Sequence, residues 1–291
     1  MFSGVYTALI TPFKNDKVDF DALKKLIDMQ YESGVSGIVP CGSTGESTTL
    51  SHQEHEEVLD FCAKYAKGKL KVLAGTGSNS TKEALCLTRF AKEVGCDGAL
   101  VVCPYYNKPT QKGLYLHYKT IADSVDIPIV LYSIVGRTAV NIEPETVATL
   151  FNDCKNIVGI KEASGSLSQM SNIKYLVPDI ELISGDDVLT LPVLSIGGIG
   201  VISVLSNIVP KEVAALLKAY EMGNIYKARD IYNRILPLTK AMFIETNPIP
   251  VKTAANMLGI CEQDLRLPMC PMQDENRIKL QQALKSFGLI K

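Results

Sequence analysis

Short apolar runs alternate with longer amphipathic stretches along most of the chain. The runs are typical of buried parallel strands: Gly4–Ile10, Gly37–Pro40, Lys71–Gly75, Gly98–Val102, Pro128–Tyr132, Ile157–Lys161, Ile180–Ser184 and Gly200–Ser203. The stretches between them show helical patterns: Asp19–Ser33, Ser51–Tyr65, Thr81–Val94, Lys112–Ser124, Pro144–Phe151, Ser168–Leu176, Leu189–Leu194 and Pro210–Met222.

Eight strands in strict alternation with eight helices predict parallel pairing through right-handed crossovers. A doubly wound sheet or a closed barrel could result, and the count of eight favours a (β/α)8 TIM barrel. After Met222 the alternation stops and three helical patterns follow, at Ile225–Phe243, Pro248–Leu258 and Asp274–Phe287. We therefore expect a catalytic barrel over residues 1–224 and a C-terminal helical subdomain over residues 225–291.

Charge and composition limit the classes of partner. Thirty basic residues balance thirty-one acidic ones without a local basic cluster, which argues against a nucleic-acid-binding protein. No apolar run approaches the roughly 20 residues of a membrane helix, and the N-terminus lacks the pattern of a signal peptide. We expect neither a membrane nor a nucleic acid as partner.

The eight cysteines and three histidines do not form a metal-binding motif. There is no C-x-x-C pair, and most cysteines lie in apolar segments, as small buried side chains do in a reducing cytoplasm. The histidines, His52, His55 and His117, include no H-E-x-x-H arrangement. We expect a cytoplasmic protein without a metal.

Lys161 and Tyr132 close two successive strands of the predicted barrel, where strand ends and the loops after them form the active face. Loss of hydration at the end of an apolar strand favours the neutral amine that attacks carbonyl groups. Strand context leaves a second role open for Lys161, with a packed stem and an ammonium group in solvent. Tyr132, about 5 Å away on the adjacent strand, could transfer protons or serve as a core aromatic.

Two loops at this face could bind an anion. Cys41–Ser47 holds Ser43 and Thr44 between glycines, which allows exposed backbone N–H groups to bind a carboxylate or phosphate, although small polar residues are common in such loops. Arg137, just after Tyr132, is either a bidentate clamp for a carboxylate or a solvated surface residue. Motifs for dinucleotides, a P-loop or a serine hydrolase are absent.

Five motifs in order along essentially the whole chain resemble those of dihydrodipicolinate synthases. They are Gly42–Ser47, Pro104–Pro109, Tyr132 with Gly136–Thr138, Gly159–Gly165 and Asn247–Lys252. The resemblance implies a lyase of the diaminopimelate route to lysine. Such an enzyme condenses pyruvate with aspartate 4-semialdehyde through a Schiff base, without a separate cofactor.

The resemblance also implies the catalytic residues. Lys161 would be the Schiff-base nucleophile. Thr44, Tyr132 and Tyr106 would relay protons, with Tyr106 reaching in from a neighbouring subunit. The protein would accordingly form a homo-oligomer, and family members are commonly tetramers built from tight dimers.

Substrate-binding positions follow from the same resemblance. Ser43 and Thr44 would hold the pyruvate carboxylate through hydroxyl and backbone N–H groups. Ile202 would line the pyruvate pocket, and Arg137 would bind the carboxylate of the semialdehyde.

A further set of positions matches the site where family members bind lysine as a feedback inhibitor: Ser47, His52, His55, Asn79, Glu83 and Tyr105. A Glu83 carboxylate could pair with an ammonium group of lysine. Because all six positions carry suitable residues, the resemblance implies inhibition by lysine. The alternative is a polar subunit interface that binds no ligand.

The chain departs from the family pattern at two places. Ser133–Val135 follows the tyrosine where asparagine and proline are usual, and Ser43 replaces the commoner threonine. The first departure bears on the rigidity of the loop and on the geometry of the second substrate. Neither removes an acid, a base or the nucleophile.

Two rival functions remain open. One is a sister aldolase, such as N-acetylneuraminate lyase or a 2-keto-3-deoxy sugar acid aldolase, against which Arg137 and the Tyr105–Tyr106 pair argue. The other is a non-catalytic lysine-binding barrel, in which loss of Lys161 or Tyr132 would be expected. Neither residue is lost.

Overall fold

The computed structural model describes residues 1–291, and its centre is a closed barrel of parallel strands. The strands follow one another around the barrel in the order β1-β10-β9-β8-β7-β6-β5-β4. They are β1 (Gly4–Ala8), β4 (Gly37–Val39), β5 (Lys71–Gly75), β6 (Gly98–Val102), β7 (Ile129–Ser133), β8 (Ile157–Glu162), β9 (Glu181–Ser184) and β10 (Gly200–Ser203). The predicted TIM barrel is confirmed.

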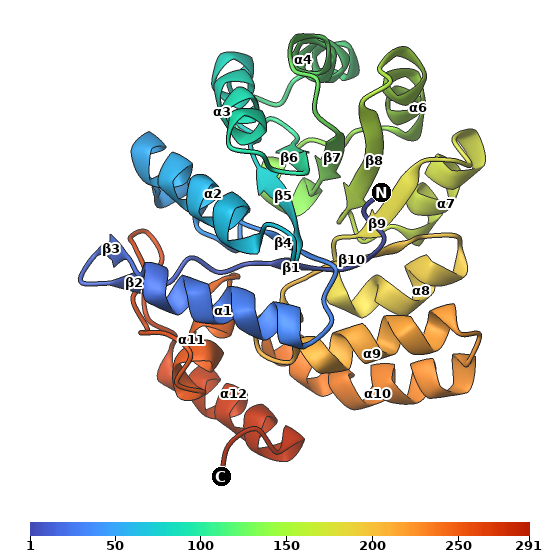
Figure 1. The fold of residues 1–291 in the computed structure, drawn as a ribbon. Helices are drawn as coiled ribbons and strands as arrows, with labels where there is room; N and C mark the ends of the chain where they lie inside the picture. The colour runs from blue at the N-terminus through green and yellow to red at the C-terminus, as the bar shows by residue number, and fades with distance from the viewer.

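A ring of helices surrounds the strands, as Figure 1 shows. These are α1 (Phe20–Glu32), α2 (His52–Ala66), α3 (Thr81–Glu93), α4 (Gln111–Ser124), α6 (Pro144–Asp153), α7 (Leu167–Leu176), α8 (Thr190–Ser195) and α9 (Pro210–Glu221). Side-chain caps begin several of them; at α2, Ser51 and Glu54 form a complete capping box.

Several short elements leave no clear pattern in the sequence, among them a hairpin and a single helical turn. The hairpin of β2 (Phe13–Lys14) and β3 (Lys17–Val18) turns through Asn15 and Asp16, both left-handed with φ of 52° and 61°, as a tight two-residue turn requires. The single helical turn α5 (Val135–Thr138) is too short to leave a periodic pattern.

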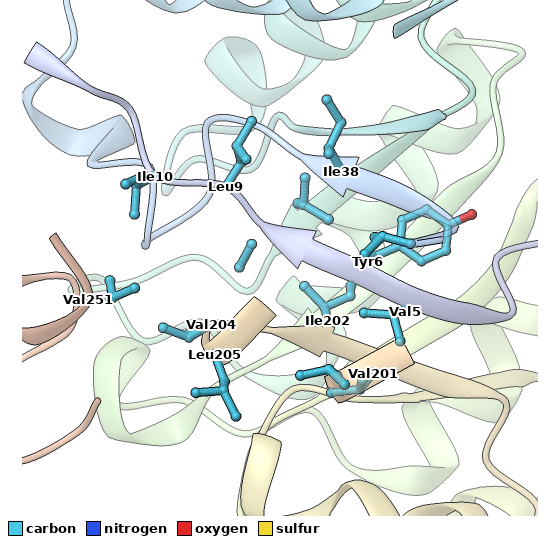
Figure 2. Packing of buried hydrophobic residues seen from close by; sticks show 14 of the residues in the cluster. Val5, Tyr6, Leu9, Ile10, Ile38, Val201, Ile202, Val204, Leu205 and Val251 are labelled. Atoms are coloured by element: carbon cyan, nitrogen blue, oxygen red, sulfur yellow. The ribbon is translucent and has the colours of Figure 1, made fainter. Parts of the chain in front are cut away.

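The three predicted C-terminal helices are present as α10 (Ile225–Ala241), α11 (Ile249–Met257) and α12 (Asp274–Phe287). Their apolar faces share one buried cluster with the barrel, which includes Ile202 of β10 and Val251 of α11. Figure 2 shows Val251 on the same side of the cluster as Ile10 and Val204. The division of the chain at residue 224 stays a prediction.

All eight cysteines are free, and six of them are buried while Cys86 and Cys270 are exposed. Burial raises the pKa of Cys62 and Cys96, the latter to about 12, so these thiols are unreactive. None of the helices combines the length and the apolar character that crossing a membrane requires.

Candidate active site

Lys161 and Tyr132 face each other at the ends of neighbouring strands. They are register partners between β8 and β7, and the Lys161 Nζ lies 4.1 Å from the centre of the Tyr132 ring. Lys161 is 6% exposed and its Nζ has no hydrogen-bond or ion-pair partner within the chain. The side chain is therefore largely buried and is not that of a surface lysine with a fully solvated ammonium group.

A glycine just after the next strand leaves room for this lysine. Gly185 follows β9, and a Cβ added there would lie 3.1 Å from the Lys161 Cε and 2.6 Å from the Ala163 Cβ. Any larger residue would press on Ala163 and on the end of the Lys161 side chain, which favours glycine at position 185.

The residue after Lys161 anchors the end of β8 on the other face of the strand. The Glu162 carboxylate accepts hydrogen bonds from the Ser164 backbone and hydroxyl groups and from Gln169 Nε2. Burial raises the pKa of Glu162, and these hydrogen bonds oppose the rise. Glu162 thus holds the strand end that presents Lys161.

The loop after β4 forms a closed turn with two free amides. Gly45 N–H and Ser47 N–H both donate to the Gly42 carbonyl, at 3.1 and 3.3 Å. The backbone N–H groups of Ser43 and Thr44 donate to no group of the protein. Adjacent free amides of this kind suit a carboxylate.

Asn247 joins this turn to Arg137. Its Nδ2 donates to the Thr44 hydroxyl at 2.9 Å, and its backbone carbonyl accepts from Arg137 Nη2 at 2.7 Å. Arg137 lies on α5 and is exposed, so its other guanidinium donors are free. The buried Asn247 Oδ1 has no partner in the chain.

One cavity of about 610 Å³ opens at this end of the barrel. Predicted substrate and catalytic residues line it: Ser43, Tyr132 and Arg137. So do five of the six residues of the predicted lysine site: Ser47, His52, His55, Glu83 and Tyr105. The two predicted sites are therefore parts of one continuous space.

Three predicted residues lie behind the lining of the cavity. Thr44 is 4% exposed, and its neighbour Ser43 and its hydrogen-bond partner Asn247 line the cavity. Ile202 is 1% exposed and pairs with Tyr6 in the barrel core. Lys161 adjoins the cavity through the Tyr132 ring.

Glu83 and two histidines form a polar group in another part of the lining. His52 Nε2 lies 3.2 Å from one carboxylate oxygen of Glu83, and the other oxygen accepts a hydrogen bond from the Ser78 hydroxyl. His55 Nε2 donates to the Gly75 carbonyl at 2.8 Å, since a carbonyl can only accept. Burial lowers the pKa of His55, so this histidine is neutral at pH 7.

Two predicted residues stand apart from the cavity. Tyr106 is 89% exposed in the loop before α4, with a left-handed φ of 73°. The Asn79 carbonyl accepts a hydrogen bond from Asn107 Nδ2 at 2.9 Å, and Asn79 does not line the cavity. No group of three or more His, Cys, Asp or Glu side chains in the chain is arranged to hold a metal ion.

Comparison with known proteins identifies the family. A model of the dihydrodipicolinate synthetase family matches residues 1–287. The chain belongs to this family. The resemblance inferred from the five sequence motifs is confirmed.

Relatives within the family are similar over their full length. The 4-hydroxy-tetrahydrodipicolinate synthase of Endomicrobium trichonymphae is 72% identical, with all of both chains covered. The crystal structure of dihydrodipicolinate synthase from Aquifex aeolicus is 50% identical with a TM-score of 0.98, covering 99% of each chain. That of the enzyme from Cyanidioschyzon merolae with lysine bound is 41% identical with a TM-score of 0.96, also covering 99% of each chain. At this similarity the chain is a lyase with 4-hydroxy-tetrahydrodipicolinate synthase activity.

Asn247, Gly185 and Lys252 contribute to the site without an individual role expected from the sequence. Asn247 and Lys252 stand in a motif that marks the family, but their partners Thr44 and Glu46 are more than 200 residues away in the chain. Only the folded backbone brings them together. The sequence signal for Gly185 was a glycine directly after a strand.

Proposed function

We propose that Lys161 forms a Schiff base with pyruvate and that the resulting enamine attacks aspartate 4-semialdehyde. The contact between Lys161 and Tyr132, as register partners at the carboxyl ends of their strands, carries this proposal. The Lys161 amine lies at the end of an apolar strand without an ion-pair partner, and an amine that is not engaged by the protein can attack a carbonyl group.

In the first step the Lys161 amine attacks the ketone carbon of pyruvate. After the attack the nitrogen gives a proton to the former ketone oxygen; the resulting hydroxyl then gains a second proton and leaves as water, which gives the protonated imine. The Tyr132 phenol, in contact with the amine, is suited to carry these protons. The two free amides of Ser43 and Thr44 would hold the pyruvate carboxylate during this step.

In the second step the protonated imine withdraws electrons, and the pyruvate methyl group loses a proton to give an enamine. The enamine carbon attacks the aldehyde carbon of the second substrate, whose oxygen takes up a proton. Arg137 would bind the carboxylate of that substrate through the donors it does not use on Asn247. The substrate amino group then displaces Lys161 from the imine, which closes the ring and frees the enzyme.

Tyr106 would complete the proton relay in the site of a neighbouring subunit. Its ring is exposed and lies outside its own cavity, and its own backbone is left-handed. We therefore propose a homo-oligomer, a tetramer built from tight dimers. A chain that was fully active as a monomer at all concentrations would contradict this role.

Lysine would bind in the same cavity, beside Glu83, and inhibit the enzyme. Ser47, His52, His55 and Tyr105 line the cavity together with Glu83, whose carboxylate could pair with an ammonium group of lysine. The Cyanidioschyzon merolae relative is a structure with lysine bound, which supports this proposal.

Free cysteines throughout the chain fit a cytoplasmic location.

Borohydride reduction in the presence of pyruvate tests the Schiff base. Peptide mass mapping should find the reduced adduct on Lys161 and should find none in Lys161→Met. The exposed Lys155 offers a matched control, since Lys155→Met should keep the adduct. An unmodified Lys161 in the active wild-type enzyme would refute the mechanism.

Assays with both classes of aldehyde separate this function from that of a sister aldolase. We expect turnover of aspartate 4-semialdehyde with pyruvate and none of sialic acid. Turnover of sialic acid alone would reverse the assignment.

A further inference from the structure

A buried ion pair joins the C-terminal helices to the turn that carries Ser43 and Thr44. Lys252 Nζ on α11 lies 2.6 Å from a Glu46 carboxylate oxygen, and the two side chains are 0% and 2% exposed. The partners are 206 residues apart in the sequence. This is the one ion pair of the chain in which both side chains are buried.

Further contacts around the ion pair hold Glu46 and Lys252 in position. Its second carboxylate oxygen accepts a hydrogen bond from the Arg266 backbone N–H at 3.3 Å. The centre of the Phe13 ring lies 4.3 Å from the Lys252 Nζ and screens it from solvent. Because a buried carboxylate without its cation is costly, the contact with Lys252 holds the Glu46 side chain in this place.

Glu46 belongs to the turn with the two free amides. Its backbone is left-handed, with φ of 53°, and its N–H donates to the Ser43 carbonyl at 3.2 Å. A non-glycine residue keeps this conformation when its surroundings enforce it. The side chain of Glu46, held by Lys252, supplies that enforcement from outside the turn.

We propose that Lys252 is a positioning residue of the reaction, which fixes the turn of residues 42–47 so that the Ser43 and Thr44 amides face the substrate carboxylate. Lys252 does not line the cavity and touches no reacting atom. It acts through Glu46. The C-terminal helices thereby contribute to substrate binding and not only to the stability of the barrel; the identity of the carboxylate as that of pyruvate rests on the function proposed above.

Lys252→Met tests this role, because methionine retains the volume of the stem and removes the charge. The unpaired Glu46 should loosen the turn, so the pyruvate concentration for half-maximal adduct on Lys161 should rise about tenfold. The KM for the semialdehyde should change less, since Arg137 donates to the Asn247 backbone carbonyl and only the Asn247 side chain contacts the turn.

A second variant and a matched control separate positioning from general stability. When Glu46→Gln is combined with Lys252→Met, no buried charge remains, and the introduced amide oxygen can still accept from the Arg266 N–H. Pyruvate half-saturation should then return to within about threefold of the wild type. Leu280→Ala, in the buried face of α12, should lower the melting temperature without touching the turn. It should leave pyruvate half-saturation unchanged.

Hydrogen exchange of the amides of residues 43–47 judges the inference independently of the reaction. Exchange should quicken in Lys252→Met and return in the double variant, and it should not respond to Leu280→Ala. If Lys252→Met does not fold, Glu46→Gln takes its place; it leaves the buried Lys252 ammonium without its counter-ion and should change half-saturation and exchange in the same direction. The proposal would be overturned if Lys252→Met left exchange and pyruvate half-saturation unchanged. It would also be overturned if Leu280→Ala changed both by the same amount at an equal loss of melting temperature. A wild-type enzyme that formed no adduct would overturn only the proposed chemistry.

Discussion

Tyr132 and Lys161 are paired in register across β7 and β8, with the Lys161 Nζ 4.1 Å from the centre of the Tyr132 ring. The phenol oxygen of Tyr132 makes no hydrogen bond within the chain. The Lys161 amine has no partner in the chain either, which leaves both groups available to a substrate. The pairing is suited to proton transfer between the two groups.

Removal of the Tyr132 hydroxyl should therefore slow the reaction without unfolding the protein. We expect Tyr132→Phe to lower kcat by about a hundredfold or more, and to slow adduct formation, because a proton carrier is lost while the ring remains. Tyr118→Phe is the matched control: it removes a buried hydroxyl bonded to the Val101 carbonyl, lies outside the site, and should keep kcat. Equal rates for Tyr132→Phe and the wild type would exclude Tyr132 from the proton relay.

Arg137 should serve the second substrate alone. We expect Arg137→Ala to raise the KM for the semialdehyde by about 10- to 100-fold, because charge-assisted hydrogen bonds to the substrate carboxylate are lost. The yield of borohydride-trapped adduct with pyruvate should not change. Arg229→Ala, at an exposed arginine on α10, provides the control. Equal losses in adduct yield and semialdehyde use would mean that Arg137 binds pyruvate instead.

Local pattern was enough to find the barrel and its central pair. Strand ends follow from apolar runs, and neighbouring strands place Tyr132 and Lys161 together whatever the rest of the chain does. The single turn α5, which carries Arg137, is too short for a periodic signal.

The contacts that hold the site together were beyond local pattern. Asn247 meets Thr44, and Lys252 meets Glu46, only because the C-terminal helices return to the barrel. The contacts of Glu83 also differ from what the local pattern indicates. As the third residue after Ser80 it suits a capping box, but its carboxylate contacts Ser78 and His52 and lines the cavity. The family resemblance identified Thr44 and Glu83 as site residues, but it did not give their contacts.

Lysine inhibition should depend on the charge of Glu83. We expect Glu83→Gln to raise the lysine concentration for half-maximal inhibition about tenfold or more, because the ammonium group of lysine loses its carboxylate partner. The kcat without lysine should stay near that of the wild type, since the Glu83 carboxylate contacts Ser78 and His52 and neither Lys161 nor Tyr132. Glu57→Gln, at an exposed position on α2, should be inhibited like the wild type. An enzyme that lysine does not inhibit at all would instead favour the alternative of a polar interface without a ligand.

His117 should make the protein less stable in acid. Its Nδ1 hydrogen-bonds with the Thr81 hydroxyl at 2.9 Å, while its buried Nε2 has no partner, and burial lowers its pKa to about 4 from an ordinary value of 6.5. Between these two values the unfolded chain takes up a proton that the folded protein rejects, so stability is full above pH 6.5 and falls as the pH drops toward 4. The shift corresponds to about 3 kcal/mol at the acid end. Urea denaturation measures the free energy of unfolding across this pH range. This free energy should fall less steeply with decreasing pH in His117→Gln, which keeps an amide for Thr81 but does not titrate. The same dependence on pH in both proteins would rule out His117 as the cause.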